Sequence, residues 1–134
     1  RIMASILRVN TITDASSNNS TAVSVINQGT AKVWVQFAGS SLSGTGTTGV
    51  DDSFNLTSMT DDDTGRYTVN INSDMNNNDY AVHSTIGQSA SAIGDYITNI
   101  ASLATGTVQV GSSTRGGSYA DSAVHSVTIH GDLA

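Results

Sequence analysis

The stretch AKVWVQFA (residues 31–38) is the clearest strand in the sequence and decides the fold. Apolar residues recur in it with period two, which places Val33, Val35 and Phe37 on one face and Trp34 on the other. A strand with one apolar face buries that face in a core. The chain is therefore expected to build a β-sheet domain around this stretch.

Further alternating runs lie on both sides of it, and clusters of turn-forming residues separate them. The expected strands cover residues 5–12, 53–59, 66–71, 80–86, 96–103, 107–110 and 122–130. Residues 96–103 suit a strand or a short helix. Frequent short strands favour a single all-β architecture, an antiparallel β-sandwich of jelly-roll-like type.

The composition favours the same fold class. There is no proline, no cysteine and no glutamate, and serine, threonine, asparagine and glycine make up nearly half of the chain. Serine and asparagine compete for backbone hydrogen bonds, so they favour turns over helix interiors. We expect the glycine-rich residues 39–50 to form a flexible loop, residues 60–65 a hairpin turn and residues 111–118 another turn. Phe54 and Leu56 are expected to point inward.

The chain is expected to divide into an extended N-terminal arm or stem, residues 1–30, and a sandwich domain, residues 31–134. The first thirty residues lack aromatic side chains. Their apolar residues would be exposed beside a lone sandwich, and contact with neighbouring chains or with a particle would bury them. These expected interface residues are Ile6, Leu7, Val9 and Ile12.

Trp34 faces away from the expected core, which leaves two interpretations. It is buried against another subunit, or both faces of its strand are covered within one chain. A small polar domain has a limited core, and trimerisation adds buried surface without lengthening the chain. We therefore expect a homotrimer with Trp34 at its interface.

The charge excludes some partners. The formal net charge is −6, with five basic residues against eleven aspartates. Nucleic-acid binding needs a basic patch to neutralise phosphates, so nucleic acid is not an expected partner. The same charge disfavours anionic membrane surfaces, and the apolar runs are too short for membrane insertion.

Few residues point to chemistry, so no enzyme activity and no cofactor are expected. Asp61, Asp62 and Asp63 offer oxygen ligands to Ca²⁺, but they lack EF-hand spacing and suit a solvated hairpin turn better. His125 and His130 are five residues apart and should face opposite sides of a strand. No Gly-x-Ser-x-Gly motif is present.

Tyr119 follows a pair of glycines and is expected in a surface loop. A tyrosine there stacks on a sugar ring or serves as a simple packing anchor. Polar loops of this kind make adaptable hydrogen bonds, and three copies in a trimer add avidity.

Several stretches resemble the C-terminal domains of tail-fibre-like and virion structural proteins of marine and cyanobacterial phages. They are AKVWVQF (31–37), DSFNLTSMTDDDTGRYTVNI (52–71), NDYAV (78–82) and DSAVHSVTIHGD (121–132), and the opening MASILRVNTITDASSNNSTAVSVINQGTA (3–31) resembles the lead-in of such proteins. The chain departs from the family pattern at Asp62-Asp63 and at Arg66.

The resemblance implies a trimeric, non-enzymatic component of the virion surface. We expect a tail-fibre or receptor-binding tip, whose arm contacts other virion proteins and whose loops recognise a host cell-surface glycan. The alternative is a trimeric capsid decoration protein on the head. A polysaccharide-modifying enzyme is a third hypothesis, which the missing catalytic motifs disfavour.

Overall fold

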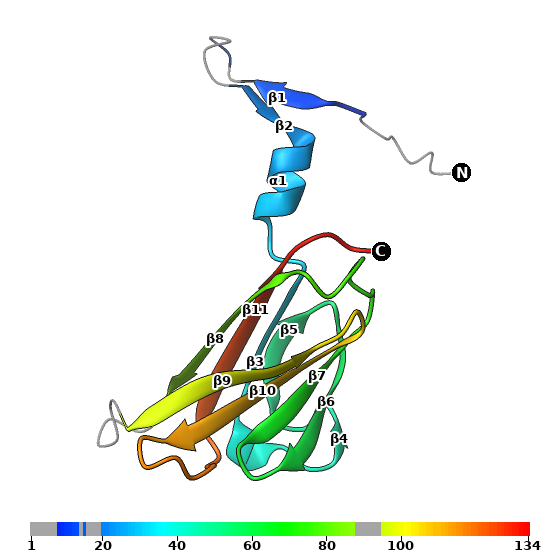
Figure 1. The fold of residues 1–134 in the computed structure, drawn as a ribbon. Coiled ribbons are helices and arrows are strands. Elements are labelled where there is room, and N and C mark those ends of the chain that lie inside the picture. Colours follow the sequence, from blue (N-terminus) through cyan, green and yellow to red (C-terminus); the bar gives the residue numbers. More distant parts are fainter. Residues whose placement is uncertain (1–7, 14, 16–19, 88–94) are drawn as a thin grey trace. The chain divides into compact units, whose positions relative to one another are not determined.

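The computed structural model describes residues 8–13, 15, 20–87 and 95–134 and is mostly β, with antiparallel sheets (Figure 1). The chain divides into two compact units, Arg1–Thr30 and Ala31–Ala134. All residues of the buried hydrophobic cluster belong to the second unit. No helix among the described residues is long and apolar enough to cross a membrane.

The first unit holds two short strands and a helix. Strands β1 (Thr11–Thr13) and β2 (Ser20–Ala22) pair in antiparallel fashion, and α1 (Val23–Gly29) follows directly. The prediction of an extended arm is wrong at α1, where the chain forms a helix. The strand predicted at residues 5–12 is also wrong in part, because its described residues before Thr11 are not in a strand. A short apolar run such as Val23–Ile26 has the same pattern in a strand and in a helix, so periodicity does not distinguish them.

The second unit consists of two antiparallel sheets. The five-stranded sheet has the order β4 (Thr45–Gly46), β6 (Leu56–Asp63), β7 (Arg66–Ile71), β10 (Thr107–Thr114) and β9 (Tyr96–Leu103). The four-stranded sheet has the order β5 (Val50–Phe54), β3 (Val33–Phe37), β11 (Val124–His130) and β8 (Ala81–Gly87). The other expected strands of this unit are present, and residues 96–103 form a strand, but the single strand expected at residues 53–59 is wrong, because it is divided between β5 and β6 of different sheets.

The core forms where the inner faces of these sheets meet. Val33, Val35 and Phe37 are buried, as the alternation in β3 predicts. Phe37 packs edge-to-face on Tyr67 of the five-stranded sheet, with ring centroids 5.2 Å apart. Val69 on β7 is also fully buried, so both sheets contribute to one hydrophobic cluster.

Phe54 does not point inward as expected, because the chain bends directly after it. Phe54 is 53% exposed, whereas Leu56 packs partly buried against the core. Asn55 between them has a φ of 56°, and its Nδ2 donates to Lys32 O and Ser73 O, both at 3.1 Å. A left-handed residue breaks the alternation, so residues on its two sides no longer share a face.

Two segments expected as loops contain regular structure. Residues 39–50 hold the 3₁₀ helix η1 (Gly39–Ser41), strand β4 and the first residue of β5, so the flexible-loop expectation is wrong there. Strand β10 continues through Ser112 and Ser113 to Thr114, so the turn expected at 111–118 is shorter. Small residues fit this end of β10 because the neighbouring backbone is close: a Cβ at Gly111 would lie 3.2 Å from Gly65 O.

The hairpin expected at residues 60–65 is present and tight. Asp63 pairs with Arg66, which leaves Thr64 and Gly65 as the turn. The carboxylate of Asp121 fixes this corner, because Oδ1 accepts hydrogen bonds from Gly65 N (2.7 Å) and from the hydroxyl of Tyr67 (2.9 Å). Burial, and next the bond to Asp121, raise the pKa of Tyr67 to about 12. The tyrosine is therefore a neutral donor at all physiological pH values.

Substitution of Gly65 by alanine should destabilise the fold. Gly65 has a φ of 64°, and an added Cβ would overlap Ser112 O and the backbone of Ala120. We expect Gly65→Ala to lower the free energy of unfolding by about 1–3 kcal/mol or more in urea titrations. Gly116→Ala is the matched control, because a Cβ there meets only Thr114 Oγ1 at 3.7 Å; it should stay within about 0.5 kcal/mol of the parent. Equal effects of the two substitutions would contradict the role of Gly65.

Candidate functional site

The outer face of the four-stranded sheet carries an ordered row of side chains. Cross-strand pairing places Phe54 opposite Trp34, Trp34 opposite Thr128, and Thr128 opposite His83. Because paired residues on neighbouring strands share a face, these four form one row across the sheet. We call this set the aromatic row.

A second row runs beside the first, two residues further along each strand. It consists of Asp52, Gln36, Ser126 and Thr85, again as successive cross-strand partners. Each of these side chains carries an oxygen or nitrogen able to form hydrogen bonds. We call this set the polar row, so the outer face combines aromatic side chains with hydrogen-bond donors and acceptors.

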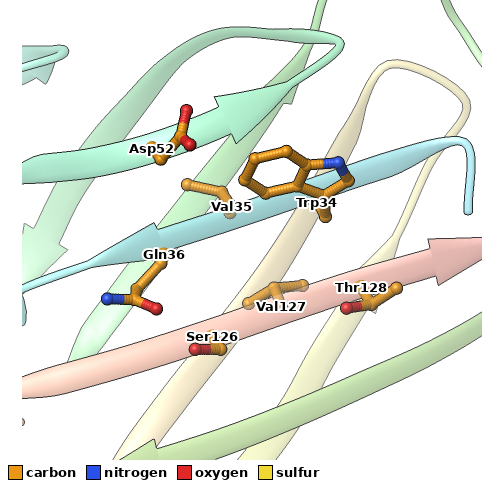
Figure 2. A pocket seen from close by; sticks show the side chains of 7 residues that line it. All are labelled: Trp34, Val35, Gln36, Asp52, Ser126, Val127 and Thr128. Atoms are coloured by element: carbon orange, nitrogen blue, oxygen red, sulfur yellow. The ribbon is translucent and has the colours of Figure 1, made fainter.

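A shallow open depression of about 320 Å³ lies between the two rows. Figure 2 shows Trp34 and Gln36 from β3, Asp52 from β5 and Ser126 from β11 around it. The remaining lining residues are Val35, Val127 and Thr128. The volume is at the lower end of about 300–1,000 Å³ that is usual for small-ligand sites.

Trp34 is 36% exposed and Phe54 53% exposed. The two interpretations of Trp34 therefore both stay predictions. In the part of the chain that the structure describes, the indole N–H of Trp34 and the hydroxyls of Ser126 and Thr128 make no intramolecular hydrogen bond. Asp52 Oδ1 accepts one from Ser53 N at 2.8 Å. The face thus offers groups that can bond to water or to a ligand.

A histidine pair at the end of the aromatic row was missed by the sequence argument. The rings of His83 and His130 are perpendicular, with centroids 5.9 Å apart. No H-x-H motif signals the pair, because His83 lies on β8 and His130 on β11. Only the cross-strand register brings them together. His125 and His130 do lie on opposite faces, as expected.

His125 belongs to a buried polar array that joins the two sheets. Its ring stacks on Phe37 at 4.8 Å, and its Nε2 lies 2.7 Å from Ser84 Oγ. Thr98 Oγ1 on the edge strand β9 donates to the same Ser84 oxygen at 2.6 Å. The direction of the Ser84–His125 hydrogen bond depends on which ring nitrogen carries the proton, because a serine hydroxyl can both donate and accept.

This Ser–His pair is a structural link, because its surroundings do not suit catalysis. His125 is fully buried, and its Nδ1 has no hydrogen-bond partner among the described residues. A catalytic serine needs an accessible oxygen and a base oriented by a third group. Burial instead lowers the pKa of His125 to about 4, so the ring is neutral at pH 7. The array connects β8 and β11 of one sheet to β9 of the other.

The three hairpin aspartates engage in separate local bonds. Asp62 Oδ2 accepts from Thr68 Oγ1 at 2.6 Å and from Gln109 Nε2 at 3.1 Å, whereas Asp63 Oδ1 accepts from Thr64 N at 2.8 Å. Asp61 pairs with Tyr67 across the hairpin. Within the described ranges, no group of three or more His or Asp side chains is placed to hold a metal ion.

The remaining sequence-predicted residues lie elsewhere on the surface. Tyr119 is 56% exposed, and the guanidinium of Arg66 lies 5.9 Å from its ring centroid. Val9 and Ile12 of the first unit are 42% and 55% exposed, whereas Ile6 and Leu7 lie outside the described residues. The structure therefore does not bring Tyr119 into the aromatic row or the polar row.

Protonation of His125 should make the fold acid-sensitive. Its folded pKa of about 4 lies below the ordinary 6.5, so the stabilisation is complete above pH 6.5 and is lost as the pH falls toward 4. We expect the free energy of unfolding to fall by about 2–3 kcal/mol between pH 7 and pH 4.5 from this residue. In urea titrations, His125→Gln should lose this part of the pH dependence of the free energy of unfolding. His83→Gln replaces an exposed imidazole and should keep it. An unchanged pH dependence in His125→Gln would refute this assignment.

Three surface features stand out among the described residues. They are the aromatic row, the polar row beside it and the exposed apolar residues of the first unit. Comparison with protein-family models, curated proteins and solved structures found no match.

Proposed function

We propose that this chain is a non-enzymatic surface protein of a bacteriophage virion, a homotrimeric receptor-binding module of a tail fibre. Its body is a jelly-roll-like β-sandwich, and its first unit attaches the trimer to other virion proteins. Two antiparallel sheets that share one hydrophobic cluster support the sandwich.

The observation that carries the proposal is the absence of a core in the described part of the first unit. Helix α1 spans seven residues and has no buried side chain. Val25 is 59% exposed, Ile26 36% and Ile12 55%. A helix this short and an isolated two-stranded sheet are both marginal in water. Such a unit gains stability when neighbouring copies cover its apolar side chains.

A trimer would bury the exposed apolar side chains of the first unit without a longer chain. Three copies of the first unit bring three sets of the same apolar residues together, and each set buries the others. The second unit has its own hydrophobic cluster and does not need the same help. We therefore propose that the trimer forms through the first unit instead of through the interface expected at Trp34, so that the surfaces of three bodies are available for receptors.

The body supports binding without catalysis. The Ser84–His125 pair is buried inside the body rather than open to a substrate. The outer face of the four-stranded sheet is the larger accessible arrangement of polar and aromatic groups described above. With three bodies on one trimer, weak single contacts give a useful avidity.

The assembly is tested by placing charge on the apolar residues of the first unit. We expect light scattering of the parent chain to give three times the 13.8 kDa chain mass, and Ile12→Asp/Val25→Asp to give the single-chain mass. Two buried charges in each subunit would cost more than the interface gains. The body should stay folded by circular dichroism.

Ile97→Asp is the matched control, because Ile97 is 47% exposed on the edge strand β9 of the body. It should leave the trimer intact. Assembly through the first unit would be overturned if the parent chain were monomeric at high micromolar concentration. It would also be overturned if Ile97→Asp dissociated the trimer and Ile12→Asp/Val25→Asp did not.

The position on the virion is tested by immunogold labelling of intact particles with antibodies against the body. Labels should lie at the fibre ends of the tail, where a receptor-binding module acts. Labels spread over the head would instead favour the capsid decoration role, and particles without any label would remove the virion proposal.

A further inference from the structure

We infer that the outer face of the four-stranded sheet, formed by the aromatic row and the polar row, is a binding platform for a neutral oligosaccharide. This inference rests on the proposed function, because it names the receptor class and the residues that contact it. It assigns the sugar to a sheet face, whereas the sequence pattern directs attention to the loop at Tyr119.

The first reason is the pairing of chemical groups. A sugar ring presents apolar C–H faces and hydroxyl edges, so it needs an aromatic surface with donors and acceptors beside it. Trp34 and Phe54 are direct cross-strand partners, so two exposed aromatic side chains lie on the same face of the sheet. Asp52, Gln36 and Ser126 lie in the neighbouring row, where they face the edge of a ring stacked on Trp34.

The second reason is the extent of the face. Neighbouring strands are spaced about 4.7–4.9 Å apart, so a row across four strands spans about 14 Å. The depression beside Trp34 is open rather than enclosed, and Figure 2 shows the side chains that line it. A chain of sugar units lies along such a row and continues beyond it, whereas a compact ligand would leave most of the row without a contact.

The third reason concerns the apolar area, which is too small for a second copy of the chain. An aromatic side chain has about 150–250 Å² of surface, so the exposed parts of Trp34 and Phe54 amount to roughly 200 Å². A stable protein interface buries about 800 Å² on each partner. The other six residues of the two rows are polar, and their desolvation would oppose a protein interface.

The fourth reason is electrostatic and selects an uncharged sugar. Asp51 and Asp52 lie next to each other at this end of β5, and Gln36 Nε2 donates to Asp51 Oδ2 at 3.4 Å. The whole chain carries a net charge of −6. Sialylated, sulfated or uronic-acid chains would be repelled by this field. A neutral oligosaccharide uses the same carboxylates as hydrogen-bond acceptors for its hydroxyls.

The test uses Trp34 as its own probe, because it is the single tryptophan of the chain. The full chain is titrated with maltohexaose, cellohexaose and chitohexaose, with hexagalacturonic acid as the anionic comparison, while indole fluorescence is recorded. We expect a saturable change with at least one neutral hexasaccharide and none with the anionic one. Absence of saturation with every neutral hexasaccharide, or saturation with hexagalacturonic acid alone, would overturn the inference.

The variants locate the site on the platform. Phe54→Ala retains the fluorescent reporter and should weaken binding at least tenfold, because it removes half of the aromatic surface. Gln36→Ala should weaken it about fivefold. Tyr119→Ala is the matched control at an equally exposed aromatic and should stay within twofold. Loss of binding in Tyr119→Ala with retention in Phe54→Ala would place the sugar at the loop and overturn the platform.

Light scattering of the same samples separates this inference from the assembly proposal. A trimeric parent that binds none of the neutral hexasaccharides would leave the assembly standing and remove the platform. A monomer that binds with the expected variant pattern would keep the platform and remove the trimer. If Phe54→Ala dissociates a trimeric parent, the face is a subunit interface, and the glycan assignment fails.

Discussion

The burial of one face of β3 constrains the rest of the structure. Val33, Val35 and Phe37 must enter the core, because they are the apolar side chains that the facing strands can cover. Period two then forces Trp34 and Gln36 to the opposite surface. A one-residue slip of β3 would exchange the two faces, which would place a polar amide in the core. The same alternation therefore determines which side chains of β3 are buried in the core and which lie on the exposed outer face.

The sequence predicts features that depend on neighbouring residues in the chain, but not features that depend on how distant strands pair. Alternation and turn residues are local, so most strands of the body, the buried set on β3 and the hairpin at residues 60–65 could be predicted, whereas β4 and the division between β5 and β6 were missed. The cross-strand register is not local. Nothing near Trp34 in the sequence indicates that Phe54 and Thr128 will be its neighbours, or that His83 ends the row.

Single-residue backbone effects account for other differences. Phe54 was expected inside because its run alternates with Leu56, but the left-handed Asn55 separates them. Ser112 and Ser113 look like turn residues, yet they continue β10 because they pair with Thr98 and Ile97 of β9. In these cases tertiary packing overrides the local propensity.

The two units meet the requirement for burial differently. The body has a contiguous hydrophobic cluster drawn from both sheets, with Met59 and Val108 among its fully buried members. The described part of the first unit has exposed Val25 and Ile12 instead. In the proposed trimer, contacts between copies would supply the burial that the first unit lacks within one chain.

The buried His125 combines an aromatic contact with a hydrogen bond inside the body. His125 stacks on Phe37 and meets the ring of Tyr67 at 90°. Unlike a hydrocarbon ring, it also forms a hydrogen bond with Ser84, which accepts one from Thr98 on the other sheet. The array orients the edge strands β8 and β9 against each other, which apolar contacts alone do less specifically. The residues that hold the sheets together are thus inside, and Trp34 and Phe54 are not among them. The binding face can therefore change its side chains while the core stays the same.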